Sequence, residues 1–335
     1  MTFWLLLPAI ACLSFLLTWI LRRYALAHSV MDVPNARSSH SVPTPRGGGV
    51  AIVLSFLVAL LLVSLAGLLP WPATWALLGA GGCVAALGFL DDHGHIAARW
   101  RLLGHFLAAA WTLFWLGGVP PLMLFGFMLD LGWLGLGMGA LYLVWLLNLY
   151  NFMDGIDGIA SVEAICVGLG GALLYGLLGE LQLIVLPLVL VAAVTGFLFW
   201  NFPPARIFMG DAGSGFIGIT LGILSLQAAW VAPQLLWSWL ILLGVFVVDA
   251  TFTLLRRFKR GDKVYEAHRS HSYQYASRQY GHFRVTVTVG LINIGWLLPI
   301  AVMVGLNFLS AVFGLLIAYL PLILLAIKFK SGLRE

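Results

Sequence analysis

Long apolar runs alternate with short polar segments along almost the whole chain. A helix needs about 20 apolar residues to cross a bilayer, and runs of that length recur from one terminus to the other. The pattern predicts about eleven membrane-spanning helices and no separate soluble domain, so that residues 1–335 form a single all-α polytopic membrane domain. The predicted spans are 3–21, 50–69, 72–90, 102–119, 133–150, 158–178, 181–200, 213–230, 234–255, 285–305 and 308–327.

The composition supports the same class. Hydrophobic residues make up 61% of the chain and charged residues only 9%, whereas an ordinary soluble domain has about 25% charged residues. The three cysteines, Cys12, Cys83 and Cys166, all lie inside apolar runs. We therefore interpret them as small packing residues rather than as disulfide partners or zinc ligands.

The basic residues predict the orientation, because Lys and Arg accumulate on the cytoplasmic side of membrane proteins. With an odd number of spans, the N-terminus outside and the C-terminus in the cytoplasm, all 18 Lys and Arg fall on the cytoplasmic face. The cytoplasmic loops are then about 22–49, 91–101, 151–157, 201–212 and 256–284. This arrangement explains the net charge of +5 without nucleic acid, which would require charge concentrated in a soluble domain.

Three acidic segments lie at the predicted cytoplasmic ends of spans. They are Asp91-Asp92, the run from Asn148 to Gly158, and the run from Asn201 to Ser214. Carboxylates at membrane depth are costly unless they have a partner or a function, and two acids at a helix C-terminus are disfavoured by the helix dipole. A solvated helix end is the alternative for Asp91-Asp92. Together the segments predict one shared site for a metal and a water-soluble phosphate substrate.

The spacing within the last two segments sharpens this prediction. Asn151, Asp154 and Asp157 are spaced three residues apart, and on a helix residues at that spacing share one face; a plain polar turn is the alternative. Asp211 opens a span among glycines, where free backbone N–H groups can meet a phosphate. A single carboxylate in that position suits Mg²⁺, which takes one or two carboxylates together with substrate oxygens. A helix-capping role is the alternative for Asp211.

Two basic loops complete the candidate chemistry. Arg46 precedes three glycines in a Pro-rich loop, which indicates a shaped turn but lacks the Lys-Ser/Thr ending of a P-loop. Arg46 either steers an anion or only sets the topology. In the second loop, His268, Arg269 and His271 suit hydrogen bonding to a diphosphate or a sugar. Zinc is disfavoured there because no cysteine accompanies the two histidines.

The segments DVPNARSSHSVPTPRGGG, GFLDD, NLYNFMDGIDG and NFPPARIFMGDAGS, with the His-containing loop, resemble the polyprenyl-phosphate N-acetylhexosamine-1-phosphate transferases of glycosyltransferase family 4. The resemblance covers residues 30–285 in the family's order. It implies an enzyme of the bacterial inner membrane that moves an amino-sugar 1-phosphate from a UDP-sugar to undecaprenyl phosphate. UMP would be released and Mg²⁺ required, with Mn²⁺ as an alternative ion. The run LLRRFKRGDKVYEAHRSHSYQ looks like the branch that initiates O-antigen or capsular polysaccharide, which is related to the phospho-N-acetylmuramoyl-pentapeptide translocase.

The resemblance also implies roles for individual residues. Catalysis falls to Asp91 and Asp92, near the lipid phosphate. Asn201 and Phe208 match positions that hold or stack on uracil. The metal-binding residues would be Asn151, Asp154 and Asp211, and the substrate-binding residues would be Arg46, Asp157, Asn201, Phe208, His268, Arg269 and His271. The last cytoplasmic loop departs from the family, because only His271 of a His-x-His-His cluster is kept.

Several alternatives stay open. The sugar could be N-acetylglucosamine, -galactosamine, -fucosamine or -quinovosamine, the transfer could take one step or two, and the protein could be a monomer or a homodimer. A CDP-alcohol phosphotransferase is disfavoured because Ile159-Ala160-Ser161 lacks that family's Arg. An ion-coupled transporter is the rival of a different class. Its binding site would be expected near the membrane midplane rather than at span ends.

Overall fold

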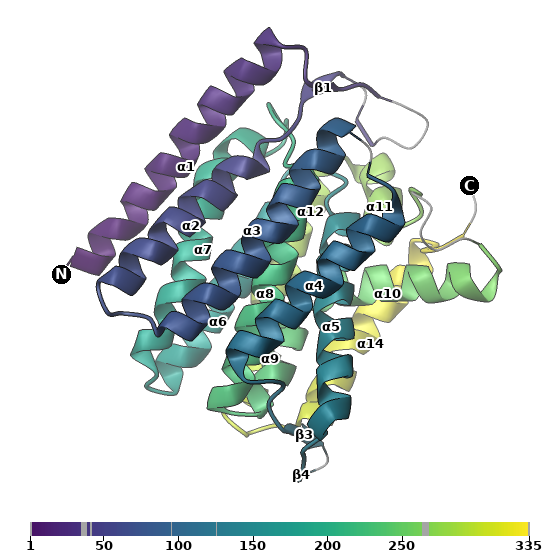
Figure 1. Ribbon diagram of the computed structural model, residues 1–335. Coiled ribbons are helices and arrows are strands. Elements are labelled where there is room, and N and C mark those ends of the chain that lie inside the picture. The colour runs from purple at the N-terminus through teal and green to yellow at the C-terminus, as the bar shows by residue number, and fades with distance from the viewer. Residues whose placement is uncertain are drawn as a thin grey trace.

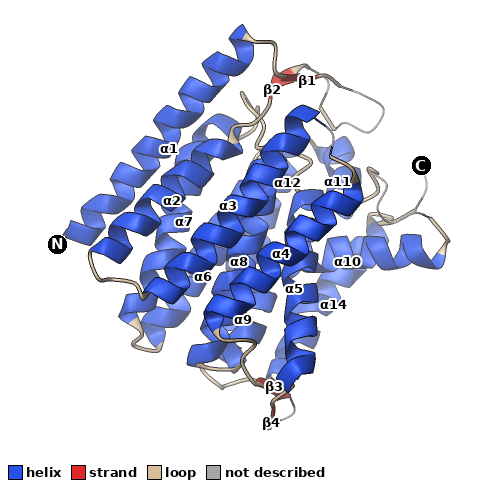
Figure 2. Ribbon diagram, viewed as in Figure 1, coloured by secondary structure: helices blue, strands red, loops and turns tan. Residues whose placement is uncertain are grey.

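The computed structural model describes residues 2–34, 39–40, 42–94, 96–124, 126–262 and 268–333, and it is almost entirely helical (Figures 1 and 2). Its α-helices are α1 (Thr2–Ala27), α2 (Gly49–Leu65), α3 (Trp71–Gly94), α4 (Ala98–Leu116), α5 (Gly132–Met153), α6 (Ile159–Leu177), α7 (Val185–Asn201), α8 (Asp211–Val231), α9 (Gln234–Leu242), α10 (Gly244–Lys259), α11 (Ser272–Tyr280), α12 (His282–Ile292), α13 (Leu298–Gly305) and α14 (Ala311–Lys328). A 3₁₀ turn, η1 (Leu181–Ile184), precedes α7, and a π-helical turn, η2 (Asn293–Leu297), joins α12 to α13. Two short antiparallel pairs join β1 (Met31–Asp32) to β2 (Thr44–Pro45) and β3 (Leu122–Leu124) to β4 (Phe127–Leu129).

Every predicted span coincides with a helix or with consecutive helices, which confirms the all-α polytopic class. Eight of the described helical segments are long and apolar enough to cross a membrane, and a ninth is added if α9 and α10 form one bent span. The other two predicted spans coincide with α2, which has only 17 residues, and with α4, which carries Arg99 and Arg101 in its first turn. The count of eleven and the orientation remain predictions.

One span differs from the predicted shape. The apolar run 234–255 predicts a continuous helix, but α9 and α10 meet at an angle of 78°. Gly244 lies at the break, and a Cβ there would lie 3.2 to 3.3 Å from Leu297 and Leu322. Close packing against α14 and η2 therefore accompanies the bend, which turns α10 away from the direction of α9.

Helix α8 is the centre of the bundle. In its apolar window 83% of the residues are buried, compared with 17% for α1. Small residues allow this burial, because glycines let the backbones of membrane helices approach closely. A Cβ at Gly218 would lie 2.9 Å from the Cα of Leu147 in α5. The first residue of α8, Asp211, is consequently surrounded by other helix ends.

The bundle has two distinct ends. Figure 1 shows β1 and α11 at one end and the β3–β4 hairpin at the other. The acidic ends of α3 and α5 and the start of α8 lie at the β1 end because successive long helices run in opposite directions. The end that carries β1 therefore holds the candidate site.

Candidate active site

One cavity of about 480 Å³ opens at this end of the bundle. Its walls come from the first basic loop, the polar run after α5, the segment between α7 and α8, and the starts of α11 and α12. It brings together seven of the residues that the sequence singled out, which are Arg46, Asn151, Asp154, Asp157, Asn201, Phe208 and Asp211.

The C-terminus of α3 meets the N-terminus of α8 through Asp92. Its carboxylate oxygens accept the backbone N–H of Asp211 at 3.2 and 3.1 Å. A carboxylate is stabilised at a helix N-terminus by the free N–H groups and the helix dipole. The acid that is unfavourable at the end of α3 is therefore favourable at the start of α8.

A single guanidinium nitrogen bridges two carboxylates at this junction. Arg46 Nη2 lies 2.6 Å from Asp92 Oδ1 and 2.8 Å from Asp211 Oδ1. Burial of Arg46 lowers its pKa, but the carboxylates of Asp211 and Asp92 outweigh burial, so that the pKa is raised overall. Arg46 thus stays charged and neutralises part of the acidic cluster.

The three glycines after Arg46 explain how that side chain reaches α8. The N–H groups of Gly48 and Gly49 donate to the carbonyls of Phe208 and Met209, each at 2.9 Å. A Cβ at Gly49 would lie 2.5 Å from the Cα of Gly213. Only glycine lets α2 begin against the backbone of α8, and this contact carries Arg46 to Asp211.

A second cavity of about 160 Å³ lies between α3, α4 and α5 and shares Asn151 and Asp211 with the first. Asp91 lines it, forms an ion pair with Arg101 and accepts the Ile96 N–H at 2.7 Å. Arg101 Nη1 also lies 3.8 Å from Asp211 Oδ2. In the sequence, Arg101 is only one of the 18 basic residues that predict the orientation, and its position ten residues after Asp91 is the single sign of this pairing.

The loops around the first cavity are tied together by two predicted substrate-binding residues. Asn201 accepts the Gly158 N–H and donates to the Ile207 carbonyl, both at 3.0 Å. Asp157 Oδ2 accepts the Ala205 N–H at 3.0 Å, while Oδ1 lies 3.1 Å from His282 Nδ1. Both residues line the cavity, but their polar atoms are already bonded within the protein. His282 was missed because no sequence motif marks it.

Asp154 differs from these residues, because its carboxylate accepts no hydrogen bond from any residue that the structure describes. Burial, and then the neighbouring carboxylates of Asp211 and Asp92, raise the pKa of Asp154 well above its ordinary value. The amide nitrogen of Asn151 donates to Ser214 Oγ at 3.0 Å, which leaves its carbonyl oxygen for a ligand. An ionised Asp154 would therefore add a buried negative charge to this corner of the cavity with no described hydrogen-bond donor beside it.

The donor set fits a hard divalent cation. Asn151, Asp154 and Asp211 offer carboxylate and amide oxygens around one cavity, and Mg²⁺ takes its remaining ligands from water and substrate phosphates. Within the described ranges, no group of three or more His, Cys, Asp or Glu is close enough to form a complete site by itself. The residues thus suit a cation that is shared with a phosphate substrate.

The predicted residues of the last loop lie elsewhere. His268 and Arg269 line a separate cavity of about 220 Å³ at the end of α10. His271 is only 2% exposed and its Nδ1 lies 3.5 Å from Asp249 Oδ1. From this region of the chain, Gln274 and His282 reach the acidic cavity instead. Substrate roles for His268, Arg269 and His271 remain predictions.

The fold and the site define a polytopic membrane enzyme whose acidic and basic side chains meet at one end of the helix bundle. The sequence model of glycosyl transferase family 4 matches residues 74–229. The probable undecaprenyl-phosphate N-acetylglucosaminyl 1-phosphate transferase of Bacillus subtilis is 32% identical over 262 residues, which cover 76% of this chain and 72% of that protein. The decaprenyl-phosphate N-acetylglucosaminephosphotransferase of Mycolicibacterium smegmatis is 32% identical over 306 residues, covering 77% and 73%.

A third relative, the phospho-N-acetylmuramoyl-pentapeptide-transferase of Moorella thermoacetica, is 33% identical over 229 residues, covering 64% of this chain and 69% of that protein. The chain therefore belongs to glycosyl transferase family 4. It is a multi-pass protein of the bacterial inner membrane.

Proposed function

We propose that this protein transfers an N-acetylated amino-sugar 1-phosphate from a UDP-sugar to undecaprenyl phosphate and releases UMP. The observation that carries the proposal is the pair of cavities that meet at Asn151 and Asp211. Two adjoining cavities with a shared acidic wall suit a reaction in which two phosphate-bearing substrates must touch.

The character of each cavity supports the placement of the substrates. The larger cavity is walled mainly by polar loops and suits the water-soluble donor. Phe208 and His40 line it with their rings 4.8 Å apart at an edge-on angle, an aromatic wall suited to a uracil base. The smaller cavity lies among the helices α3, α4 and α5 and suits the phosphate of a lipid acceptor.

The arginines support the charge balance that this reaction needs. Arg46 lies on the donor side of Asp211, and Arg101 lies on the acceptor side. Phosphoryl transfer depends chiefly on positioning and on neutralising the phosphate oxygens. Arg46 and Arg101 lie near Asp211 from the two cavities. Each could turn to the phosphate of the substrate in its own cavity when that substrate binds.

We assign the bond changes as follows. An acceptor phosphate oxygen forms a bond to the sugar-linked phosphorus, and the bond from that phosphorus to the UMP oxygen breaks. Asp91 lines the acceptor cavity and is the proposed base toward the lipid phosphate, while Asp92 holds Arg46 and the start of α8 in place. Asn151, Asp154 and Asp211 would hold Mg²⁺ or Mn²⁺, which when bound supplies positive charge to the diphosphate.

We also propose a donor sugar and a product for this reaction. N-acetylglucosamine is the first donor sugar to test, because two of the relatives are named for it. The product would initiate a lipid-linked surface polysaccharide such as O-antigen, as the resemblance of the last cytoplasmic loop suggests.

The proposal is tested by UMP release from purified protein with undecaprenyl phosphate, Mg²⁺ and a panel of UDP-amino sugars. We expect lipid-dependent UMP from one donor and none from an Asp211→Asn control. If the folded, Mg²⁺-replete protein releases no UMP from any member of the panel, the proposed reaction is wrong.

A further inference from the structure

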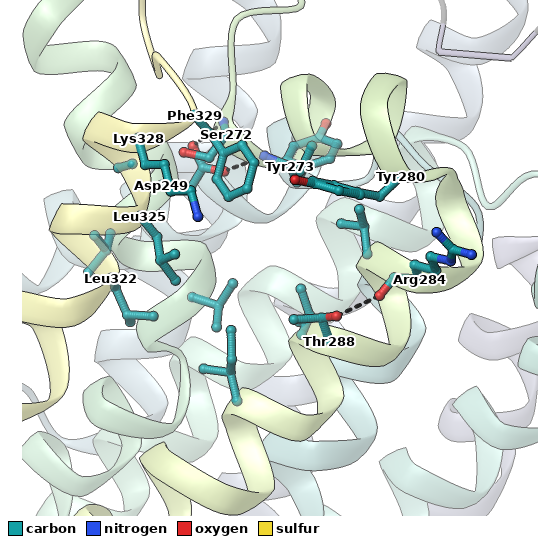
Figure 3. Close-up of a pocket in the computed structure, with 17 residues that line it drawn as sticks. Asp249, Ser272, Tyr273, Tyr280, Arg284, Thr288, Leu322, Leu325, Lys328 and Phe329 are labelled. Carbon is teal, nitrogen blue, oxygen red and sulfur yellow. Dashed lines mark hydrogen bonds between the residues drawn. The ribbon is translucent and has the colours of Figure 1, made fainter.

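Asp249 of α10 is a buried carboxylate that lines neither the donor cavity nor the acceptor cavity. Its side chain is satisfied from three directions, because it accepts hydrogen bonds from Thr253 Oγ1 at 3.2 Å, Ser331 Oγ at 3.1 Å, and two backbone N–H groups at the start of α11. Those N–H groups belong to Ser272 and Tyr273, at 2.9 and 3.1 Å (Figure 3). A buried carboxylate is costly without such partners, so Asp249 and the start of α11 depend on each other.

Asp249 accepts two of the free N–H groups at this helix start, and the side chain of Gln274 accepts the His271 N–H at 3.1 Å. Asp249, Ser272 and Tyr273 lie at the polar end of a groove of about 430 Å³ whose other walls are mostly apolar side chains of α10, α12 and α14 (Figure 3). The free N–H groups at a helix N-terminus need acceptors. The Asp249 carboxylate of α10 accepts the N–H groups of Ser272 and Tyr273.

Helix α11 in turn contacts the acidic segment. Tyr273 Oη donates to the Phe152 carbonyl at 2.9 Å, and Gln274 lines the larger cavity. A Cβ at Gly155 would overlap Tyr273 Oη, so the two segments are in direct contact. A continuous chain of contacts thus leads from Asp249 through Tyr273 to the segment that carries Asp154.

We propose that Asp249 is a positioning residue: it fixes α11 so that Tyr273 and Gln274 hold residues 152–157 in their active arrangement. The expected loss of turnover rests on the proposed function. The expected loss of order in residues 152–157 when Asp249 is changed does not, because it depends only on the contacts through α11.

The kinetic test compares Asp249→Asn, Tyr273→Phe and the double variant. Turnover is measured as UMP release per molecule able to bind UMP, so that partial unfolding is not counted as lost activity. Misplacement of a site by about 1 Å can cost about 100-fold, and we expect kcat to fall roughly ten- to 100-fold with little change in either KM. Because both changes interrupt one chain of contacts, the double variant should be no worse than Asp249→Asn.

The matched control is Glu163→Gln. Glu163 is also fully buried, and it accepts a hydrogen bond from Asn293 at 2.6 Å in a different part of the bundle. Gln retains an oxygen that can accept this bond, so the kcat of Glu163→Gln should stay close to that of the wild type. Full kcat in Asp249→Asn, or multiplicative losses in the double variant, would overturn the positioning role.

Hydrogen exchange tests the same link without activity. We expect Asp249→Asn to speed exchange in peptides covering both 150–158 and 272–280, whereas Glu163→Gln should change neither. Faster exchange confined to 272–280 would overturn the link. Should Asp249→Asn fail to fold, Tyr273→Phe must still speed exchange at 150–158. If wild-type protein releases no UMP, the proposed function fails while the exchange result still decides this inference.

Discussion

Gly88 of α3 provides a direct test of how tightly the two site helices must pack. A Cβ at this position would lie 2.5 Å from the backbone nitrogen of Ala212 and 2.6 Å from the carbonyl carbon and oxygen of Asp211. Ordinary contacts of a Cβ begin near 3.4 Å, so Gly88→Ala must push α3 and α8 roughly 1 Å apart. A shift of that size at a reacting centre costs about 100-fold in rate. Overpacking itself costs about 1–3 kcal/mol of stability.

The same helix offers a matched control, because a Cβ at Gly82 would meet nothing within 4 Å. Gly82→Ala should keep wild-type turnover and a thermal unfolding temperature equal to or above that of the wild type, since Ala stabilises a helix interior relative to Gly by about 1 kcal/mol. The measurements are kcat for UMP release and the unfolding temperature of each purified variant. More than half of wild-type kcat in folded Gly88→Ala, or equal losses in both variants, would refute the reasoning.

Three further outcomes follow from individual carboxylates. Asp211→Asn should abolish turnover and weaken Mn²⁺ binding, read by paramagnetic resonance, while the protein still unfolds cooperatively; undiminished Mn²⁺ binding would remove Asp211 from the metal site. The raised pKa of Asp154 means that the folded protein holds this proton more tightly than the unfolded chain, so the group lowers stability as pH rises above about 4. Asp154→Asn in EDTA should therefore unfold at a higher temperature than the wild type at neutral pH, with the difference closing toward pH 4. Asp91→Asn removes the proposed base of the acceptor cavity and should lower kcat by about 100-fold while leaving the KM for the UDP-sugar close to that of the wild type; a kcat near the wild-type value would argue against the assigned base.

The spans and the convergence of the acidic segments could be predicted from the sequence, because both depend only on the length and the order of the apolar runs along the chain. The lengths of the apolar runs mark the helices, and the alternation of helix direction places every second helix end on the same side. The bend at Gly244 could not be predicted in this way. It accompanies packing against Leu297 and Leu322, contacts that the local apolar pattern does not encode.

The partners of the site residues were equally hidden. Arg46 and Asp211 are 165 residues apart, and Asp157 and Asn201 bond to loops that come together only in the fold. Their residue types pointed to a polar site, but not to whether each polar atom faces a substrate or another loop. His282 shows the converse case, since an isolated histidine at the start of an apolar run has no sequence signal that it will pair with Asp157.

The distribution of partners indicates where a ligand's charge is most needed. Arg46 pairs with Asp92 and Asp211, Arg101 pairs with Asp91, and His282 lies against Asp157. Asp154 alone among these carboxylates accepts no hydrogen bond from the described residues, and burial together with the acids around it raises its pKa. Filling its surroundings with another arginine would stabilise the empty protein, but it would also leave no room for a cation shared with the substrate. The unpaired position of Asp154 is therefore better explained by ligand binding than by stability. Asp154→Asn should stabilise the empty protein and, because it removes a proposed metal ligand, lower turnover.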